Sequence, residues 1–327
     1  MLAQLTCHLL RVFIMIIIGV ITLESFADQA QDKSSFAAPK AKERLLMDIK
    51  QLASGRLITV GERGHILVSD DQGNSWQQKT VHTQALLTKL FFVNEKLGWA
   101  VGHQQTILVS RDGGESWQIQ HTANDVSQPA LFDVWFSDEQ NGFAVGAYGL
   151  YLATEDGGQS WQPIYQERLA DDEIGLPHFY SISYDKQTRQ LFMAGELGFL
   201  AKSIDKGQTW EKLTSPYHGS FFNIASLENG HLMVMGLRGH LFRSTDSGEN
   251  WQPIETNTIS GLQELTQLDD KQIIIVGSDG TLLISDDVGE NFKLRQRSDR
   301  VHLAHALKTL DGKILLVGVE GIMPLEQ

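Results

Sequence analysis

Cysteine is nearly absent from this 327-residue chain: Cys7 is the only one, and it lies in an apolar N-terminal segment. Without that segment the chain carries no thiol. A disulfide framework, a thiolate metal site and a cysteine nucleophile are therefore excluded for the remainder of the protein.

Long apolar runs and the common catalytic fingerprints are also missing. No run of 18 apolar residues follows Leu23, so we expect no helical membrane span in the mature chain. A net charge of −13 disfavours nucleic acid as a partner. The chain has no Gly-x-Ser-x-Gly elbow, no Walker-type loop and no dinucleotide fingerprint in a suitable context, so those hydrolase and nucleotide-binding classes find no support.

The N-terminus has the composition of an export signal. Arg11 is its only basic side chain, residues 12–20 are apolar, and Ser25 and Ala27 place small residues at a cleavage site. We predict a signal peptide at residues 1–27 and export to the periplasm or the outer face of a membrane, with an uncleaved anchor as the alternative. Residues 28–43 form a polar, alanine-rich N-terminal segment.

A repeat dominates the rest of the chain. Each unit contains Val-Gly, two spacers and a near-constant Gly, followed by Ser/Thr-x-Asp-x-Gly-x-x-Trp, and the spacings between units are 41, 44, 49, 41, 41 and 41 residues. The aromatic residue lies 15 positions after each of the first six anchoring glycines. The anchoring glycines are Gly61, Gly102, Gly146, Gly195, Gly236, Gly277 and Gly318.

One unit, such as residues 86–121, holds four β-type runs separated by turn residues, of which the first is the most apolar. Such a unit cannot bury its faces alone, so neighbouring units stack into a closed ring. We therefore predict an all-β, seven-bladed β-propeller of four-stranded blades over residues 44–327, with the first strand of each blade lining a central channel.

The repeated aspartates invite a catalytic interpretation, but six near-identical copies at one turn argue for structure. Each Asp can accept hydrogen bonds from its own turn, the Gly suits a left-handed residue, and the Trp can pack between blades. The predicted structural residues are Asp71, Asp112, Asp156, Asp205, Asp246 and Asp287.

The seventh unit is incomplete, because the chain stops at Gln327 before any Asp turn. We predict that part of residues 28–43 supplies the missing outer strand of this blade and closes the ring.

The Ser/Thr-x-Asp-x-Gly-x-Ser/Thr-Trp element resembles the Asp-box of bacterial neuraminidase repeats. Joined to Val-Gly-x-x-Gly at fixed distance, it more closely resembles the photosystem II stability and assembly factor family, over residues 44–327. That resemblance implies a non-enzymatic accessory protein outside the membrane, which binds a protein partner and assists assembly of a membrane protein complex. In the family a basic patch on the propeller is implicated, whereas this chain is acidic overall.

Length variation in the repeat points to one end of the ring. Extra residues occur in 118–130 and 162–178, within connections that lie at the same end as the Gly-x-x-Gly turns, which makes this the predicted binding face. We expect a basic arc there to face an acidic loop and to orient a partner, with ordinary solvated surface charges as the alternative. The candidate partner-binding residues are Arg63, Arg238, Arg295, Arg297, Arg300, His178, Glu167, Asp171 and Asp172.

Other functions remain open at this point. A glycoside hydrolase of the sialidase type would need paired carboxylates across the channel mouth, yet the Arg-Ile-Pro motif is missing. Channel aromatics suit core packing better than a ligand pocket, and the histidines show no metal-ligand spacing. We expect no catalytic residues, no cofactor, no metal and a monomer. The carboxylates considered are Asp133, Glu196, Glu264 and Asp279; the aromatics are Trp135, Phe179, Tyr180, Phe221 and Phe222; the histidines are His65, His82, His103, His121, His178, His218, His240 and His302.

Overall fold

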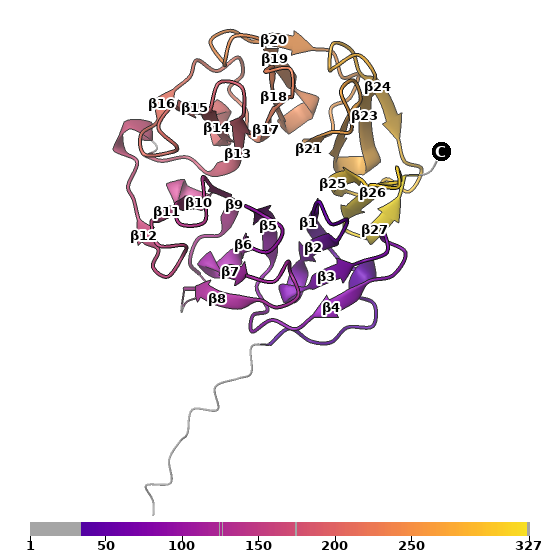
Figure 1. The fold of residues 1–327 in the computed structure, drawn as a ribbon. Helices are drawn as coiled ribbons and strands as arrows, with labels where there is room; N and C mark the ends of the chain where they lie inside the picture. The colour runs from indigo at the N-terminus through magenta and orange to yellow at the C-terminus, as the bar shows by residue number, and fades with distance from the viewer. Residues whose placement is uncertain (1–33, 124, 126, 174, 326–327) are drawn as a thin grey trace, which may run out of the picture. The chain divides into compact units, whose positions relative to one another are not determined.

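A computed structural model describes residues 34–123, 125, 127–173 and 175–325. Within these ranges the chain forms a ring of seven antiparallel sheets around a central channel, which confirms the predicted seven-bladed β-propeller (Figure 1). The predicted signal peptide, residues 1–27, lies outside the described residues.

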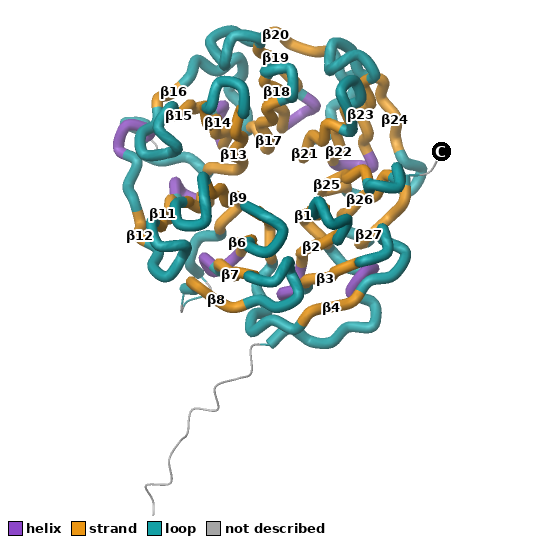
Figure 2. Tube along the Cα trace, viewed as in Figure 1, coloured by secondary structure: helices purple, strands orange, loops and turns teal. Residues whose placement is uncertain are grey.

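The first four blades each contain four strands, ordered from the channel outwards as they occur in the sequence (Figure 2). Their bounds are β1 (Leu46–Gln51), β2 (Leu57–Gly61), β3 (Ile66–Ser69), β4 (Gln77–Lys79); β5 (Leu87–Phe92), β6 (Gly98–Gly102), β7 (Ile107–Ser110), β8 (Gln118–His121); β9 (Leu131–Phe136), β10 (Gly142–Gly146), β11 (Tyr151–Thr154), β12 (Gln162–Pro163); β13 (Phe179–Asp185), β14 (Gln190–Gly195), β15 (Leu200–Ser203) and β16 (Glu211–Lys212).

Blades five and six also have four strands, whereas blade seven has three among the residues that the structure describes. Their bounds are β17 (Phe221–Ser226), β18 (Leu232–Gly236), β19 (Leu241–Ser244), β20 (Gln252–Ile254); β21 (Leu262–Gln267), β22 (Ile273–Gly277), β23 (Thr281–Ser285), β24 (Lys293–Gln296); β25 (Leu303–Lys308), β26 (Ile314–Gly318) and β27 (Gly321–Pro324).

Short 3-10 turns join the second and third strands of the first six blades, and two more lie at residues 41–43 and 167–169. We call the end of the ring that carries the six turns and the connections between blades the upper end, and the opposite end the lower end. The 3-10 turns are η1 (Ala41–Glu43), η2 (Glu62–Gly64), η3 (His103–Gln105), η4 (Ala147–Gly149), η5 (Glu167–Leu169), η6 (Glu196–Gly198), η7 (Leu237–Gly239) and η8 (Ser278–Gly280).

The anchoring glycine of each repeat is required by a close backbone contact rather than by its φ angle. In blade two, a Cβ on Gly102 would lie 2.1 Å from the carbonyl oxygen of Leu86, just before the first strand. That oxygen accepts a hydrogen bond of 2.9 Å from the amide of His103. All seven glycines make the equivalent approach, at 2.0 to 2.2 Å, so the turn can close onto the first strand only where Cβ is missing.

The Asp turns are closed by hydrogen bonds within each turn. In blade three, Asp156 Oδ1 accepts from Thr154 Oγ1 at 2.8 Å and from the amide of Ser160 at 2.9 Å, and Oδ2 accepts from Ser160 Oγ at 2.7 Å. The other five aspartates accept the equivalent bonds, with Asn in place of the later Ser or Thr in blades five and six.

The hydrogen bonds of the Asp turns predict that the folded protein loses stability in acid. Bonds from Ser75 lower the pKa of Asp71 from 3.8 to about 2, and bonds from Ser160 lower the pKa of Asp156 equally. A depressed native pKa contributes stability that is present above the unfolded value and is lost as pH falls through the native value. We therefore expect the unfolding temperature to fall between about pH 4 and about pH 2. Thermal unfolding followed by circular dichroism tests this, with Asp156→Asn expected to show a weaker acid dependence; an unfolding temperature that is constant across this range would contradict it.

Apolar cores fill the spaces between blades, and the repeated aromatic residue belongs to them. Trp117 packs in the core between blades one and two, Trp161 between two and three, and Phe292 between five and six. The core between blades six and seven has no such aromatic, because blade seven has no Asp turn.

Within the described residues the structure does not show the predicted closure of blade seven by an N-terminal strand. Residues 34–43 form no strand and lie instead along blade one, where the Ser35 amide donates to the Val81 carbonyl at 2.7 Å and the Ala38 amide to Gln78 Oε1 at 2.8 Å. The turn η1 then passes blade seven, so that a Cβ on Gly321 would lie 2.0 Å from the Lys42 carbonyl oxygen. Ala41 completes the core between blades seven and one.

Hydrogen-bond geometry explains why blade seven tolerates its three strands. The Leu325 amide donates to the Ile314 carbonyl, so in an antiparallel ladder the backbone groups of Ile322 and Pro324 face outwards from β27. Proline has no amide hydrogen, which leaves this edge with one outward donor fewer and discourages a further strand.

Candidate functional site: the central channel and its two ends

A ring of polar residues crosses the channel. The third residue of the first strand is polar in all seven blades, although its neighbours are largely apolar, and the strand register shifts at this residue. We call these residues the channel ring: Asp48, Lys89, Asp133, Ser181, Asn223, Glu264 and His305.

Part of the channel ring ties neighbouring blades together. Asp48 Oδ2 accepts the Leu90 amide of blade two at 2.8 Å, and Asp133 Oδ2 accepts the Ile182 amide of blade four at 2.8 Å. Asp133 Oδ1 accepts the amide of Val134 at 2.7 Å. These buried carboxylates therefore satisfy backbone donors that the strand bulges leave free.

Lys89 is the central cation of the ring. Its Nζ lies 2.9 Å from Glu264 Oε2 and 4.0 Å from Asp48 Oδ1, and the ring nitrogen Nδ1 of His305 hydrogen-bonds Asp48. Burial alone would lower the pKa of Lys89, but Glu264 and Asp48 raise it well above its ordinary value. Burial alone would likewise raise the pKa of Asp48, yet Lys89, Lys50 and His305 lower it well below its ordinary value.

Asp133 differs from Asp48 because no cation lies in ion-pair contact with it among the described residues. Burial raises the pKa of Asp133 to about 6, against the opposing effect of Lys89.

The channel ring was missed as a functional feature at the sequence level, although the polar third residue recurs in every repeat and could have been found by aligning the units.

The predicted basic arc is only partly contiguous. Arg238 on η7 and Arg300 line one cleft of about 660 Å³ between blades five and six, together with Asp279, whose Oδ2 lies 2.7 Å from Arg300 Nη1. Arg63 lies on η2 in blade one, and Arg295 lies on the outer strand β24. Within the described chain Arg297 pairs with Asp299, their atoms Nη2 and Oδ2 being 2.5 Å apart.

The predicted acidic loop lies at the outer side of blades three and four. Glu167 begins the turn η5, which contacts β16, and Lys212 Nζ donates to the Ala170 carbonyl at 2.8 Å. Asp171 bridges to Gly175 through two backbone hydrogen bonds of 2.8 and 2.9 Å. Glu167, Asp171 and Asp172 are exposed.

His178 belongs to a row of aromatic rings at the upper end. Its ring lies 4.5 Å from that of Tyr148 and 6.4 Å from that of Phe132, and its Nδ1 accepts the Tyr148 amide at 2.7 Å. The row continues from Phe132 to Tyr180 at 5.4 Å and to Phe222 at 5.9 Å. We call these five residues the upper aromatic row.

The upper aromatic row runs from solvent into the channel. Tyr148 is 74% exposed, whereas Phe132, Tyr180 and Phe222 line a cavity of about 270 Å³ above the channel ring, with His103. The other aromatic residues predicted to line the channel do not belong to this row. Phe179 and Phe221 are buried between blades, and Trp135 lies below the channel ring.

The carboxylates considered for glycoside hydrolysis already have partners. Glu196 accepts the His178 amide at 3.4 Å, Asp279 pairs with Arg300, and Glu264 pairs with Lys89. Asp133 and Glu264 do line one cavity, together with Lys89. No group of three or more His, Cys, Asp or Glu side chains able to hold a metal occurs among the described residues. No helix within the described ranges is long and apolar enough to cross a membrane.

Comparison with solved structures shows the same fold in two proteins named YCF48. "YCF48 bound to D1 peptide" has a TM-score of 0.68 and 18% identity, covering 89% of this chain and 93% of the other. YCF48 from Cyanidioschyzon merolae has a TM-score of 0.68 and 17% identity, covering 89% and 97%. A streptogramin B lyase has a TM-score of 0.71 and 11% identity, covering 88% and 94%, so this likeness shows the fold and not the activity.

Comparison of the sequence with family models shows which of these proteins of similar fold shares a family with the chain. No curated protein matches the chain. The family model for photosynthesis system II assembly factor YCF48 matches residues 74–129 and 121–267, which together make up more than half of the chain. The resemblance noted in the repeat is thereby confirmed: the chain belongs to the YCF48 family of photosystem II assembly factors, whose Asp-box repeats form a β-propeller.

Proposed function

We propose that this chain is an exported, non-enzymatic propeller that binds a protein partner and assists assembly or stability of a membrane protein complex. Membership of the YCF48 family supports the assembly role, and a solved YCF48 structure bears the name "bound to D1 peptide". The two proteins are 18% identical, so the proposal specifies a protein partner and not the D1 peptide.

The observation that carries the proposal is the upper aromatic row. It offers exposed apolar surface at Tyr148 and, on the neighbouring turn η6, at Leu197, which is 55% exposed. Both residues hold left-handed φ angles of +56° and +54°, a strained conformation for side chains larger than Gly. Exposed aromatic and apolar residues on a rigid scaffold are typical of protein interfaces. The cleft with Arg238 and Arg300 supplies cationic groups at the same end.

The state of the channel carboxylates supports the non-enzymatic part. An acid–base pair needs one carboxyl with a proton to give and one free to accept. Burial raises the pKa of Asp133, but both of its oxygens accept backbone amides, and Glu264, the other carboxylate of this cavity, is held by Lys89 rather than free to accept a proton.

Replacing Tyr148 and Leu197 together by serine is expected to reduce recovery of the partner about tenfold, because interface energy concentrates in a few large apolar residues. The protein would be isolated with its partner from the periplasmic fraction after gentle cross-linking. Ile204→Ser is the matched control, since Ile204 is 75% exposed but lies on an Asp turn at the lower end.

Three results would count against this proposal. Equal recovery by the double variant and the control would contradict the upper-end interface. Retention of the wild type in the cytoplasm would contradict export. Hydrolysis of a glycan panel by the wild type, abolished in Glu264→Gln, would contradict the non-enzymatic role.

A further inference from the structure

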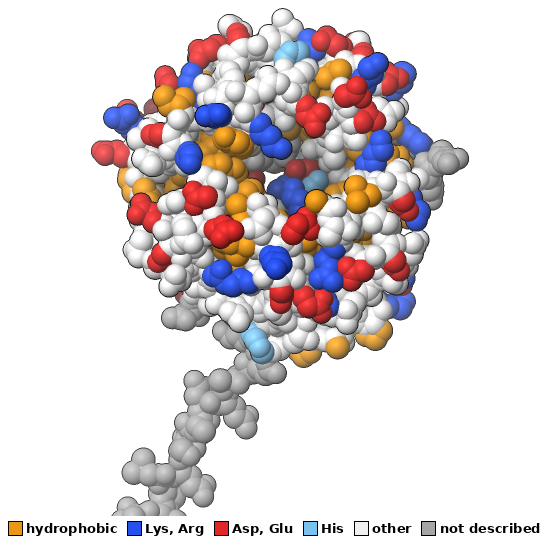
Figure 3. Space-filling model, in the orientation of Figure 1, with side chains coloured by type: hydrophobic (Ala, Val, Ile, Leu, Met, Phe, Trp, Pro, Cys, Tyr) orange, Lys and Arg blue, Asp and Glu red, His pale blue; other side chains and the backbone are white. Residues whose placement is uncertain are grey.

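The lower end of the channel holds a cavity of about 660 Å³ directly below the channel ring, which we call the lower vestibule. Its charged lining consists of four lysines against two carboxylates: Lys50, Lys89, Lys186 and Lys206, with Asp133 and Glu264. The vestibule is therefore locally positive in a chain whose net charge is −13. Blue basic side chains lie around and within the central opening in Figure 3.

Two of these lysines, Lys186 and Lys206, are available for an external anion. Lys89 is committed to Glu264, but no ion pair within the described residues involves Lys50, Lys186 or Lys206. Lys186 and Lys206 are exposed and come from two turns of blade four, while Lys50 comes from β1. Lys50 already stabilises the Asp48 carboxylate, so the exposed Lys186 and Lys206 supply the positive charge that favours a negatively charged ligand in the vestibule.

An apolar wall accompanies the lysines. Phe91, Trp135 and Tyr184 line the vestibule, and the rings of Trp135 and Tyr184 are 5.5 Å apart. Hydrophobic side chains are visible in orange on the inner wall of the opening in Figure 3. A small inorganic anion would leave this wall without a contact.

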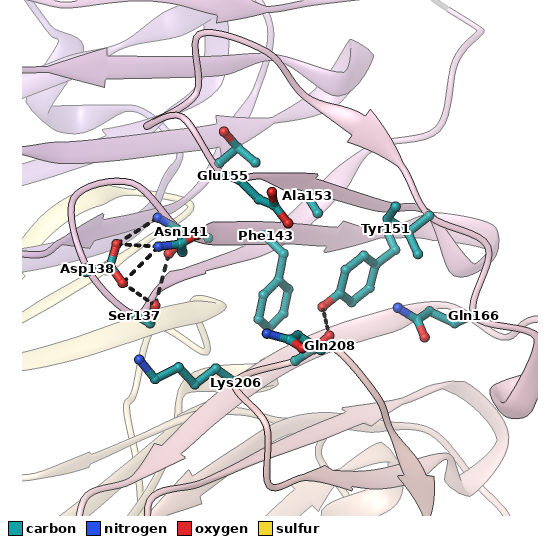
Figure 4. Close-up of a pocket in the computed structure, with 14 residues that line it drawn as sticks. Ser137, Asp138, Asn141, Phe143, Tyr151, Ala153, Glu155, Gln166, Lys206 and Gln208 are labelled. Atoms are coloured by element: carbon teal, nitrogen blue, oxygen red, sulfur yellow. Dashed lines mark hydrogen bonds between the residues drawn. The ribbon is translucent and has the colours of Figure 1, made fainter.

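A second cavity continues the vestibule outwards between blades three and four. It has a volume of about 490 Å³ and shares Ser137 and Lys206 with the vestibule, so the two form one groove. Figure 4 shows Phe143 and Tyr151 side by side in this cleft, with Lys206 and Gln208 on the opposite side. The rings of Phe143 and Tyr151 are stacked 4.8 Å apart, and Tyr151 Oη donates to the Gly207 carbonyl at 2.8 Å.

The cleft itself does not favour an anion. Its Asp138 accepts the amides of Gln140 and Asn141, each at 2.9 Å, and bonds from the side chains of Ser137 and Asn141 (Figure 4). Burial would raise the pKa of Asp138, but these bonds lower it to about 2. Asp138 therefore stays charged at neutral pH, and Glu155 also lines the cleft. The groove thus has a positive inner half and an outer half with an apolar floor and a weakly acidic rim.

We propose that this lower groove binds an extended acidic polypeptide segment, whose carboxylate side chains enter the lower vestibule and whose apolar residues follow in the cleft between blades three and four. The two connected cavities, of about 660 and about 490 Å³, run from the channel to the cleft between blades three and four, a path that suits several residues of an extended chain. The site lies at the end opposite to the upper aromatic row, so it adds a second binding surface to the proposed function.

The test measures binding of a fluorescein-labelled peptide with a glutamate-rich half and a leucine-rich half, by fluorescence anisotropy. Lys186→Glu combined with Lys206→Glu is expected to raise the dissociation constant about tenfold or more, because two favourable surface charge interactions become repulsive. The matched control combines Lys96→Glu with Lys271→Glu. Both lysines lie on lower-end turns of other blades, neither lines the groove, and the change in net charge is identical.

A second pair of variants tests the apolar half. Ile164 lies at the cleft and is 43% exposed, and Ile164→Asp is expected to weaken binding about fivefold. Ile259→Asp is the control, because Ile259 is 87% exposed and lines the upper cleft between blades five and six.

Several outcomes decide whether the lower groove binds an acidic polypeptide. Loss of binding when the glutamates of the peptide are replaced by glutamine supports the proposal, as does a weaker affinity at high salt. Equal affinities of the groove and control variants overturn it. Recovery of the upper-end partner by the Lys186→Glu, Lys206→Glu variant leaves the proposed function intact, so failure of the groove and failure of the proposed function are distinguishable.

Discussion

Replacing Lys89 by methionine is expected to lower the free energy of unfolding at pH 7 by about 3–5 kcal/mol, because breaking a buried ion pair leaves its partners uncompensated. The Lys89 side chain is 16% exposed, while those of Glu264 and Asp48 are 18% and 0% exposed. Without the ammonium group, the carboxylates of Glu264 and Asp48 would lose the cation that lies between them in the channel. Methionine keeps the approximate length of the side chain, so the loss reports charge rather than volume.

Urea unfolding followed by tryptophan fluorescence measures this effect. Lys293→Met is the control, because Lys293 and Asp286 form an exposed pair, and we expect a change below about 0.5 kcal/mol there. Adding Glu264→Gln to Lys89→Met should restore part of the lost stability, since one of the unpaired charges is removed. A Lys89→Met protein as stable as the wild type would show that the channel ring is well hydrated and contributes little.

Replacing Gly102 by alanine should cost about 3 kcal/mol or more, since the new methyl group would lie 2.1 Å from a backbone oxygen that cannot rotate away. The φ angle of Gly102 is −176°, an extended conformation that alanine adopts freely. The expected loss therefore comes from the clash with the Leu86 carbonyl and from displacement of its hydrogen bond with the His103 amide.

Gly312→Ala separates this clash from ordinary backbone strain. Gly312 has a φ of +88° and no atom within 4 Å of its would-be Cβ, so only the left-handed conformation opposes alanine, at about 1 kcal/mol. Chemical unfolding of both variants gives the comparison. Equal losses in the two proteins would mean that the turn relaxes away from the first strand, and that another constraint explains the repeated glycine.

The repeat made most of the fold predictable, because each unit carries its own turn chemistry. Gly102, Asp112 and Trp117 illustrate this: a glycine where the turn meets the first strand, a carboxylate that closes the next turn, and an indole in the core between blades. These contacts are local or recur between adjacent units, so a single sequence displays them seven or six times over.

The last blade shows where this reasoning fails. The missing Asp turn correctly indicated an incomplete blade, but residues 34–38 bond to blade one rather than pairing with β27. A non-repetitive segment carries no periodic signal for its partner. Pro324, on the edge that such a strand would have to join, removes one of the required donors.

The sequence carries a weaker signal for the binding face than for the fold. Arginines that are close in the sequence lie apart in the structure. Arg295 lies on an outer strand, whereas Arg300 pairs with Asp279 and shares a cleft with Arg238 from another blade. No common motif links Lys50, Lys186 and Lys206 in the sequence, because they belong to a strand, a hairpin turn and an Asp turn.

The repeat sets the number of blades, the position of their turns and the residues that close them, because those features depend on contacts within or between neighbouring repeats. Which charges meet depends instead on the folded ring. Lys89 and Glu264 are 175 residues apart and His305 and Asp48 are 257 apart, yet each pair is in contact. Closure of the ring brings the first strands of distant blades to one narrow channel, and burial there makes their charges depend on one another.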